Sequence, residues 1–251
     1  MTVAARAYRT SAVVLRGRTY GEADRILTLF STLRGKMDAI AKGVRRTKSH
    51  LAGRLELGNE VALEMHRGRS LDVIVSAELE QAHWQHLVRP DRYAAACLVL
   101  ELIDGFCEPD LPLPDVYALL AGALRAIEKS EAPLALLPRF SLRLLEALGL
   151  APPLDSCVRC GGPLNGSQTW LDAEQGGFTG AECRTSWHET IELDRDDMQN
   201  LRALAAAAGR DVKAALHARK RAAQAIEALV NHHLGRRPKA GLHALEFVEK
   251  S

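Results

Sequence analysis

The stretch Arg34–Arg54, RGKMDAIAKGVRRTKSHLAGR, joins a short apolar run to a long polar loop. It contains seven Lys/Arg and one acid, so its formal charge is +6, whereas the whole 251-residue chain has a formal charge of +2. This concentration of positive charge indicates a polyanion surface rather than a small-molecule pocket. The candidate contacts are Arg34, Lys36, Lys42, Arg45, Arg46, Lys48 and Arg54. The alternative is a solvated loop whose charges only keep the protein soluble.

Five short runs rich in Val, Ile and Leu surround this stretch and predict β-strands. They are Ser11–Arg16, Arg25–Phe30, Lys36–Lys42, Glu60–Met65 and Leu71–Ala77. The third connection, Gly43–Asn59, is the longest and has room for one helical turn at His50–Leu57. Five strands with a long third connection predict a Greek-key barrel of the oligonucleotide-binding (OB) type over residues 1–80. An SH3-like barrel would give a similar pattern.

In an OB barrel the basic stretch would fall on the usual ligand face, which favours nucleic acid. No Phe, Tyr or Trp occurs between Ser31 and His83, so the basic region itself lacks a base-stacking platform. Binding is therefore expected to rest on phosphate contacts, to ignore base sequence and to weaken steeply with salt.

The rest of the chain is dominated by helical patterns. The predicted helices are Pro90–Phe106, Val116–Lys129, Leu134–Leu148, Asp194–Ala208 and Lys213–Leu234. We expect a helical bundle formed by residues 81–152 and 190–251, with a small module inserted at 153–189. The fold class is thus α+β and multidomain, with an OB barrel, an α-helical bundle and an inserted zinc-ribbon-like knuckle.

The inserted module carries a metal-ligand pattern. Cys157 and Cys160 form CVRC before Gly-Gly-Pro, and Cys183 follows at a distance that suits a second knuckle. Ser186 stands where a complete ribbon would place a fourth cysteine, so His188 is the nearest competent ligand. We expect one structural Zn²⁺ ion bound by Cys157, Cys160, Cys183 and His188. A degenerate site without metal, or a three-cysteine site completed by water or Glu189, are the alternatives.

A second basic region runs from Arg210 to Lys239, with eight Lys/Arg and two acids. Its candidate contacts are Arg219, Lys220, Arg236, Arg237 and Lys239, and it could form one surface with the first region. No P-loop, HExxH motif, paired-carboxylate metal signature or nucleophile–base set is visible, so an enzyme is not expected. No apolar run approaches the roughly 18 residues of a membrane span, and we expect a cytoplasmic protein without a membrane partner.

Two segments resemble the opening of the RecO family of DNA repair and recombination mediators. They are TSAVVLRGRTYGEADRILTLFS (Thr10–Ser31) and GKMDAIAKGVRRTKSHLAGRLE (Gly35–Glu56). The resemblance implies binding of ssDNA and dsDNA, strand annealing, and a nucleoid-associated role with a RecR partner in loading RecA onto strands coated with single-strand-binding protein (SSB). It also implies that the helical bundle docks the acidic SSB tail, for which Arg139 and Arg143 are candidates unless they are ordinary solvated residues.

Two other classes fit the residues without the resemblance. One is an RNA-binding or ribosome-associated barrel protein with a zinc ribbon, which would prefer structured RNA. The other is a zinc-dependent hydrolase or nuclease, whose DNA cleavage would depend on Cys157.

Overall fold

The computed structural model describes residues 7–184, 191–206 and 218–240. Residues up to Pro133, together with those from Lys239, form one compact unit, and Leu134–Pro238 form a second. The domain boundaries expected near residues 80, 152 and 189 remain a prediction. In the part of the chain that the structure describes, no helix is both long enough and apolar enough to cross a membrane.

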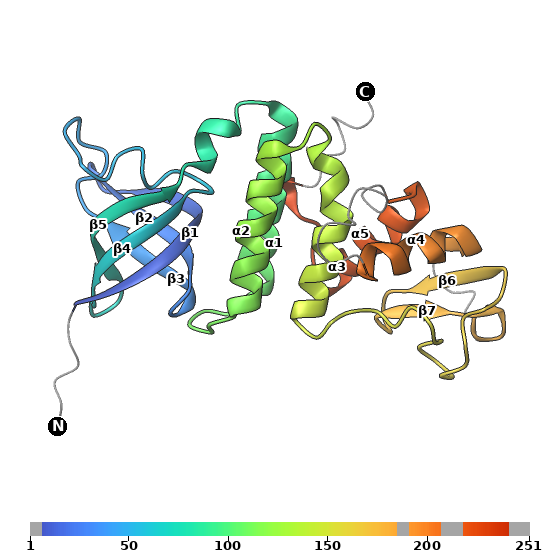
Figure 1. Ribbon diagram of the computed structural model, residues 1–251. Coiled ribbons are helices and arrows are strands. Elements are labelled where there is room, and N and C mark those ends of the chain that lie inside the picture. Colours follow the sequence, from blue (N-terminus) through green and yellow to red (C-terminus); the bar gives the residue numbers. More distant parts are fainter. Residues whose placement is uncertain (1–6, 185–190, 207–217, 241–251) are drawn as a thin grey trace. The chain divides into compact units, whose positions relative to one another are not determined.

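The first unit begins with a closed five-stranded barrel (Figure 1). Its strands are β1 (Ala7–Tyr20), β2 (Asp24–Ser31), β3 (Gly35–Ala41), β4 (Glu60–His66) and β5 (Asp72–Gln81). The order around the barrel is β1-β2-β3-β5-β4, and β3 pairs with β5 in parallel while the other neighbours are antiparallel. This Greek-key order is that of the OB type, which decides against the SH3-like alternative.

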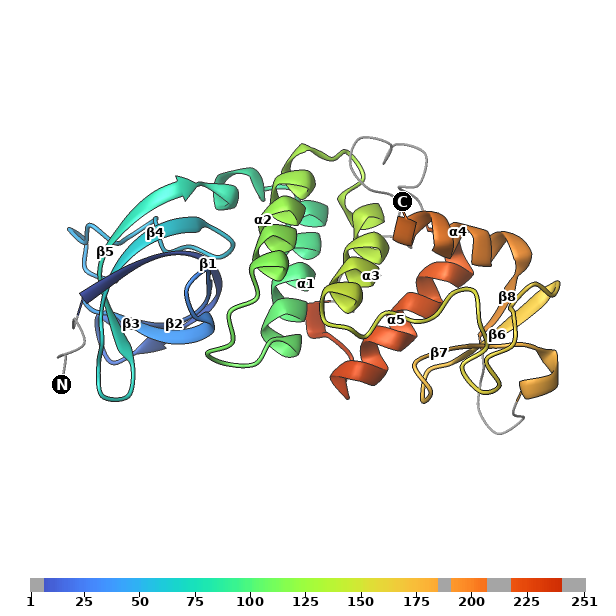
Figure 2. The same ribbon diagram turned by 60° about the horizontal axis from the view of Figure 1, so that its bottom comes forward.

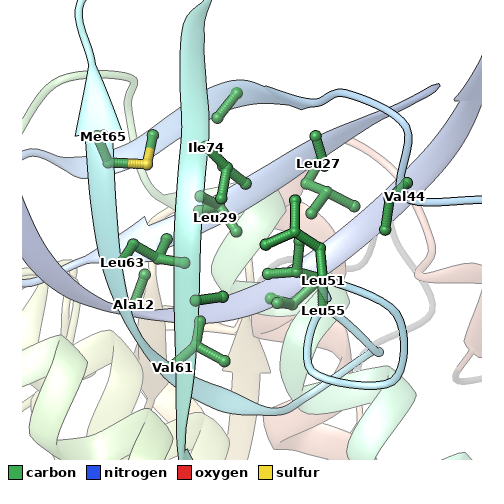
Figure 3. Packing of buried hydrophobic residues seen from close by; sticks show 14 of the residues in the cluster. Ala12, Leu27, Leu29, Val44, Leu51, Leu55, Val61, Leu63, Met65 and Ile74 are labelled. Atoms are coloured by element: carbon green, nitrogen blue, oxygen red, sulfur yellow. The ribbon is translucent and has the colours of Figure 1, made fainter. Parts of the chain in front are cut away.

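Period-two alternation of apolar residues builds the barrel core. Leu27 and Leu29 of β2 and Leu63 and Met65 of β4 belong to the same core, and all four are almost completely buried (Figure 3). Leu51 and Leu55 from the long connection fill the same core. The expected helical turn at His50–Leu57 is wrong, because this loop is a series of turns; Val44 near its start is buried with the two leucines.

Strand β1 is longer than the expected run Ser11–Arg16. It continues to Tyr20, paired with β2 along its whole extension, with a register shift between Val14 and Arg16. Residues 16–20 are all exposed, so they show no apolar alternation from which the sequence could predict a strand.

Helices α1 (Pro90–Phe106) and α2 (Pro114–Lys129) lie side by side in the same unit (Figures 1 and 2). Phe30 of the barrel stacks on Tyr117 of α2, with ring centroids 6.5 Å apart. His83, in a short 3-10 helix (His83–His86), is fully buried between two carboxylates. Its Nε2 lies 2.8 Å from Glu60 of β4, and its Nδ1 contacts Glu128 of α2. Apolar and polar contacts together therefore fix the barrel against these helices.

The second unit packs α3 (Leu137–Ala147), α4 (Arg195–Ala206) and α5 (Lys220–Leu234) against one another. A three-stranded sheet of order β7-β6-β8 accompanies them, built from β6 (Gln168–Asp172), β7 (Gly177–Thr179) and β8 (Glu192–Asp194). The helix expected from Lys213 starts at Lys220, because Arg219 has extended backbone angles (φ −61°, ψ 151°); positions 213–217 lie outside the described residues. Barrel, helices and a cysteine cluster together confirm the expected fold class.

Candidate nucleic-acid interface and metal centre

The outer face of β1, β2 and β3 follows from the strand register. Gly17 pairs with Leu27, and Leu27 pairs with Ala39. Leu27 and Ala39 are core residues, so these three paired positions face the inside of the barrel. Neighbouring positions alternate, so the opposite set lies on the outside of the barrel. That set comprises Arg16, Arg18 and Tyr20 on β1, Ile26 and Thr28 on β2, and Lys36, Asp38 and Ile40 on β3.

The first two basic candidates are engaged in ion pairs inside the chain. Arg34 donates from Nη1 to Asp72 Oδ2 at 2.7 Å and from Nη2 to the carboxylate of Asp110. Lys36 donates from Nζ to the backbone oxygen of Asp104 at 2.6 Å and lies 3.8 Å from its carboxylate. Asp104 belongs to α1 and Asp110 to the loop after it, so these cations hold the barrel against the helices.

The other five candidate DNA contacts are exposed to solvent and form no ion pairs within the described residues. They are Lys42, Arg45, Arg46, Lys48 and Arg54. We call these five cations of the β3–β4 connection the basic loop. Backbone turns order it: Arg46 N–H donates to Gly43 O at 3.1 Å, and Ser49 N–H donates to Arg46 O at 3.0 Å. The loop presents positive charge that no acid in the described part of the chain neutralises.

Two residues that the site prediction omitted lie next to the basic loop. Arg18 and Tyr20 occupy the exposed end of β1, on the outer face. Three hydrogen bonds join the following turn to the loop: Asp24 Oδ1 accepts from Gly43 N (2.7 Å), Ala23 O from Arg45 N (2.9 Å), and Glu22 O from Arg45 Nη1 (3.2 Å). The sequence does not predict that Arg18 and Tyr20 lie near the basic loop, because residues 16–20 have no strand-like pattern. The pairing of β1 with β2 shows it.

The second basic region does not form one patch. Arg219 is bound internally: it contacts the carboxylates of Asp194, Asp196 and Asp197 at 2.6 to 3.4 Å. It precedes α5 with Lys220, whereas Arg236 and Arg237 follow the other end of this 15-residue helix, roughly 22 Å away at the usual rise. Arg237 lies 3.7 Å from Glu227. Lys239 belongs to the first unit, where its backbone N–H donates to Glu101 Oε1 at 3.0 Å.

The two candidate partner contacts lie together on α3. Arg139 is half-buried, and its burial, followed by the charge of Arg143, lowers the pKa of its guanidinium. Arg143 forms a 3.0 Å ion pair with Glu146 one turn along the helix. The two arginines share one face of α3, four residues apart. Their role in binding a partner remains a prediction.

The cysteines gather as the spacing predicted. The sulfurs of Cys157, Cys160 and Cys183 all lie within 4.8 Å of one another. Gly161 has a left-handed backbone (φ 73°) and its N–H donates to Cys157 O at 2.9 Å, which closes the knuckle. Cys183 ends a short 3-10 helix (Ala181–Cys183) after β7. The expected fourth ligand, His188, lies outside the described residues, as does Glu189.

The chemistry of this donor set fits a soft divalent cation. Burial raises the pKa of the Cys157 thiol, but backbone N–H groups of Cys160, Arg159 and Gly180 outweigh it and lower the pKa to about 6. The neighbouring sulfurs of Cys160 and Cys157 instead raise the pKa of Cys183 to about 11. Three thiolates this close would repel one another, and a cation between them would offset that repulsion. A metal ion would supply such a charge, and the sulfur spacing is compatible with Zn–S bonds of about 2.3 Å.

Comparison with known proteins gives consistent matches along the chain. The family "Recombination protein O N terminal" matches residues 5–83, and "Recombination protein O C terminal" matches residues 88–242. A DNA repair protein RecO from Frankia casuarinae is 36% identical over 251 residues, covering 97% of this chain and 99% of the relative. A DNA repair protein RecO from a Nocardioides species is 40% identical over 181 residues, covering 70% and 74% respectively. The chain therefore belongs to the RecO family of DNA repair proteins.

Proposed function

We propose that this protein is a recombination mediator that binds ssDNA and dsDNA through the basic loop, largely without sequence specificity. The observation behind this proposal is the set of five exposed cations on one connection of an OB barrel, none of which forms an ion pair within the described residues. Phosphate contacts by Lys and Arg supply affinity but no sequence information. A mediator of repair must act on any broken strand, and this mode of binding suits that task.

Arg34 and Lys36 would stabilise the barrel and would not contact DNA. Both were candidate DNA contacts, but their internal ion pairs occupy the charge that a phosphate would need. They hold the barrel against α1 and the loop after it, and so fix the platform that carries the basic loop. In the second region, Lys220, Arg236, Arg237 and Lys239 keep exposed side chains and remain additional candidates, whereas Arg219 is bound by three carboxylates.

The partner steps of the proposal follow the family. The protein anneals complementary strands, engages SSB-coated ssDNA and acts with RecR so that RecA is loaded. Arg139 and Arg143 would bind the acidic SSB tail, because two arginines on one helix face suit a carboxylate-rich peptide. The Cys157–Cys160–Cys183 cluster would hold one structural Zn²⁺ ion that stabilises the second unit. The protein is then a binding protein rather than an enzyme, and it acts in the cytoplasm at the nucleoid.

The test compares a basic-loop variant with a matched control. In the loop variant Lys42, Arg45, Arg46, Lys48 and Arg54 are changed to Gln; the control changes the exposed Arg9 and Lys129 of the same unit to Gln. We expect the loop variant to lose annealing of complementary oligonucleotides, both bare and SSB-coated, and the control to retain it. Unchanged annealing by the loop variant would overturn the proposal. Tighter binding to structured RNA than to ssDNA, in direct competition, would favour the RNA-binding alternative.

A further inference from the structure

The tip of the β1–β2 hairpin exposes an aromatic side chain. Tyr20 is the last residue of β1, and 53% of its surface is exposed. It makes no hydrogen bond or ring contact with any residue that the structure describes. The hairpin turns through Gly21, whose left-handed backbone (φ 58°) lets the chain reverse just after the tyrosine. About half of this large side chain is therefore open to solvent and available to a ligand.

Hydrogen bonds place this ring beside the first cations of the basic loop. Tyr20 pairs directly with Asp24 across the hairpin, and cross-strand partners lie about 5 Å apart. Asp24 in turn accepts a 2.7 Å hydrogen bond from Gly43 N, the residue that follows Lys42. Arg45 donates its backbone N–H to Ala23 O at 2.9 Å. The hairpin tip and the loop are thus held together before any ligand arrives.

The strand register also places Tyr20 on the outer face of the barrel. It shares that face with Arg18, two residues earlier, while Gly17 and its partner Leu27 belong to the inner set. On β3 the same alternation gives Lys36, Asp38 and Ile40 an outward direction and continues to Lys42. The end of this face near Lys36 is occupied by contacts with Asp104 and Asp110. The end that carries Tyr20 remains exposed.

We propose that Tyr20 is a base-stacking platform at the start of the DNA path, with Lys42 and Arg45 contacting the adjoining phosphates. This inference rests on the proposed function and deepens it. Stacking requires an unpaired base, so Tyr20 gives the interface a preference for single strands that phosphate contacts alone cannot supply. Every base has an aromatic face, so binding remains indifferent to sequence. The sequence suggested that the basic region lacks such a platform; strand pairing supplies one from outside it.

The experiment uses the full chain with three variants. Tyr20→Leu removes the ring, Tyr20→Phe retains it, and Tyr93→Leu removes another exposed tyrosine, 42% exposed on α1, as the control. The probes are an oligo-dT strand, the same strand with abasic sites, and a duplex of equal length. We expect Tyr20→Leu to weaken oligo-dT binding by about 5- to 150-fold. Duplex binding and the slope of log affinity against log salt should stay unchanged, because the phosphate contacts remain.

Two further results complete the test. Tyr20→Phe and Tyr93→Leu should bind oligo-dT as the parent does, and the abasic strand should abolish the difference between the parent and Tyr20→Leu. Equal oligo-dT binding by Tyr20→Leu and the parent would overturn the inference. So would an equal loss on oligo-dT, abasic strand and duplex, since the residue would then only shape the hairpin. If the basic-loop variant also binds DNA like the parent, the proposed function itself fails; if only the Tyr20 effect is missing, the stacking platform alone fails.

Discussion

Arg34 and Lys48 belong to the same basic stretch, but the structure predicts opposite consequences when each is changed to Met. The side chain of Arg34 is 32% exposed and is held by Asp72 and Asp110, whereas Lys48 is exposed and forms no ion pair within the described residues. Methionine keeps an unbranched apolar chain and removes the charge. We expect Arg34→Met to lower stability without changing DNA binding, and Lys48→Met to weaken DNA binding without changing stability.

The stability cost follows from the environment of Asp72, whose side chain is 9% exposed. Without Arg34 this carboxylate keeps hydrogen bonds from Tyr8 Oη at 2.5 Å and Gly68 N at 3.1 Å, but loses its compensating charge. Breaking a fully buried pair costs about 3–5 kcal/mol and an exposed pair about 0–1 kcal/mol. Arg34 is partly exposed and Asp72 is nearly buried, so we expect the cost of breaking this pair to fall between these two values, at about 2 kcal/mol. A loss of that size lowers the unfolding midpoint by roughly 4–8 °C.

The effect on DNA binding follows from counterion release. Each lost phosphate contact reduces the slope of log affinity against log salt by about 0.7 on single strands and about 0.9 on duplex. Lys48→Met should show that reduction, and neutralising all five cations of the basic loop should reduce the single-strand slope by up to about 3.5. Arg34→Met should leave the slope at the parental value. A surface change such as Lys48→Met should alter the free energy of unfolding by less than about 0.5 kcal/mol.

The assay combines fluorescence anisotropy of a labelled oligonucleotide at several salt concentrations with hydrogen exchange of the barrel strands. Asp72→Asn is the matched control, because it breaks the same pair from the other side and should reproduce the loss of protection seen in Arg34→Met. A reduced salt slope in Arg34→Met, with normal protection of the barrel, would contradict a structural role for Arg34. It would show that Arg34 contacts phosphate and that the internal pair contributes nothing.

Three further predictions concern metal, backbone and pH. The purified protein should hold one zinc ion by elemental analysis, lost in Cys183→Ser and kept in Cys97→Ser; full zinc in Cys183→Ser would exclude this site. A Cβ on Gly35 would lie 1.9 Å from Leu111 O, and φ is +66° there. Gly35→Ala should therefore destabilise the first unit by about 2 kcal/mol or more in urea unfolding, and a neutral result would contradict the close approach. Burial raises the pKa of the Cys107 thiol from 9.0 to about 11. Because the folded state favours the neutral thiol, this stabilisation is complete below pH 9 and is lost as pH rises toward 11; Cys107→Ala should flatten that decline, and an unchanged profile would argue against it.

Local patterns predicted much of the fold and part of the cysteine cluster. Short runs rich in Val, Ile and Leu predicted all five barrel strands, because each strand buries such residues in the common core. The short CVRC spacing and the later Cys183 predicted a cluster that the structure brings within 4.8 Å. The strand runs and the CVRC spacing depend on chain geometry over a few residues, whereas the approach of Cys183 depends on the fold between positions 160 and 183. The fourth ligand expected at His188 stays a prediction.

The charge pattern predicted less of the candidate DNA interface, because a residue's formal charge does not show which residues it contacts. From the sequence alone it follows that Arg34–Arg54 is strongly basic and includes a predicted barrel strand. Tertiary structure decided that Arg34 is paired with Asp72 and Asp110, 38 and 76 positions away, while Lys48 remains free of such pairs among the described residues. It also decided that Tyr20 lies beside the basic loop, through strand pairing and three hydrogen bonds. The physical reason is that ion pairing and exposure depend on distances in space, which folding sets between residues far apart in the chain.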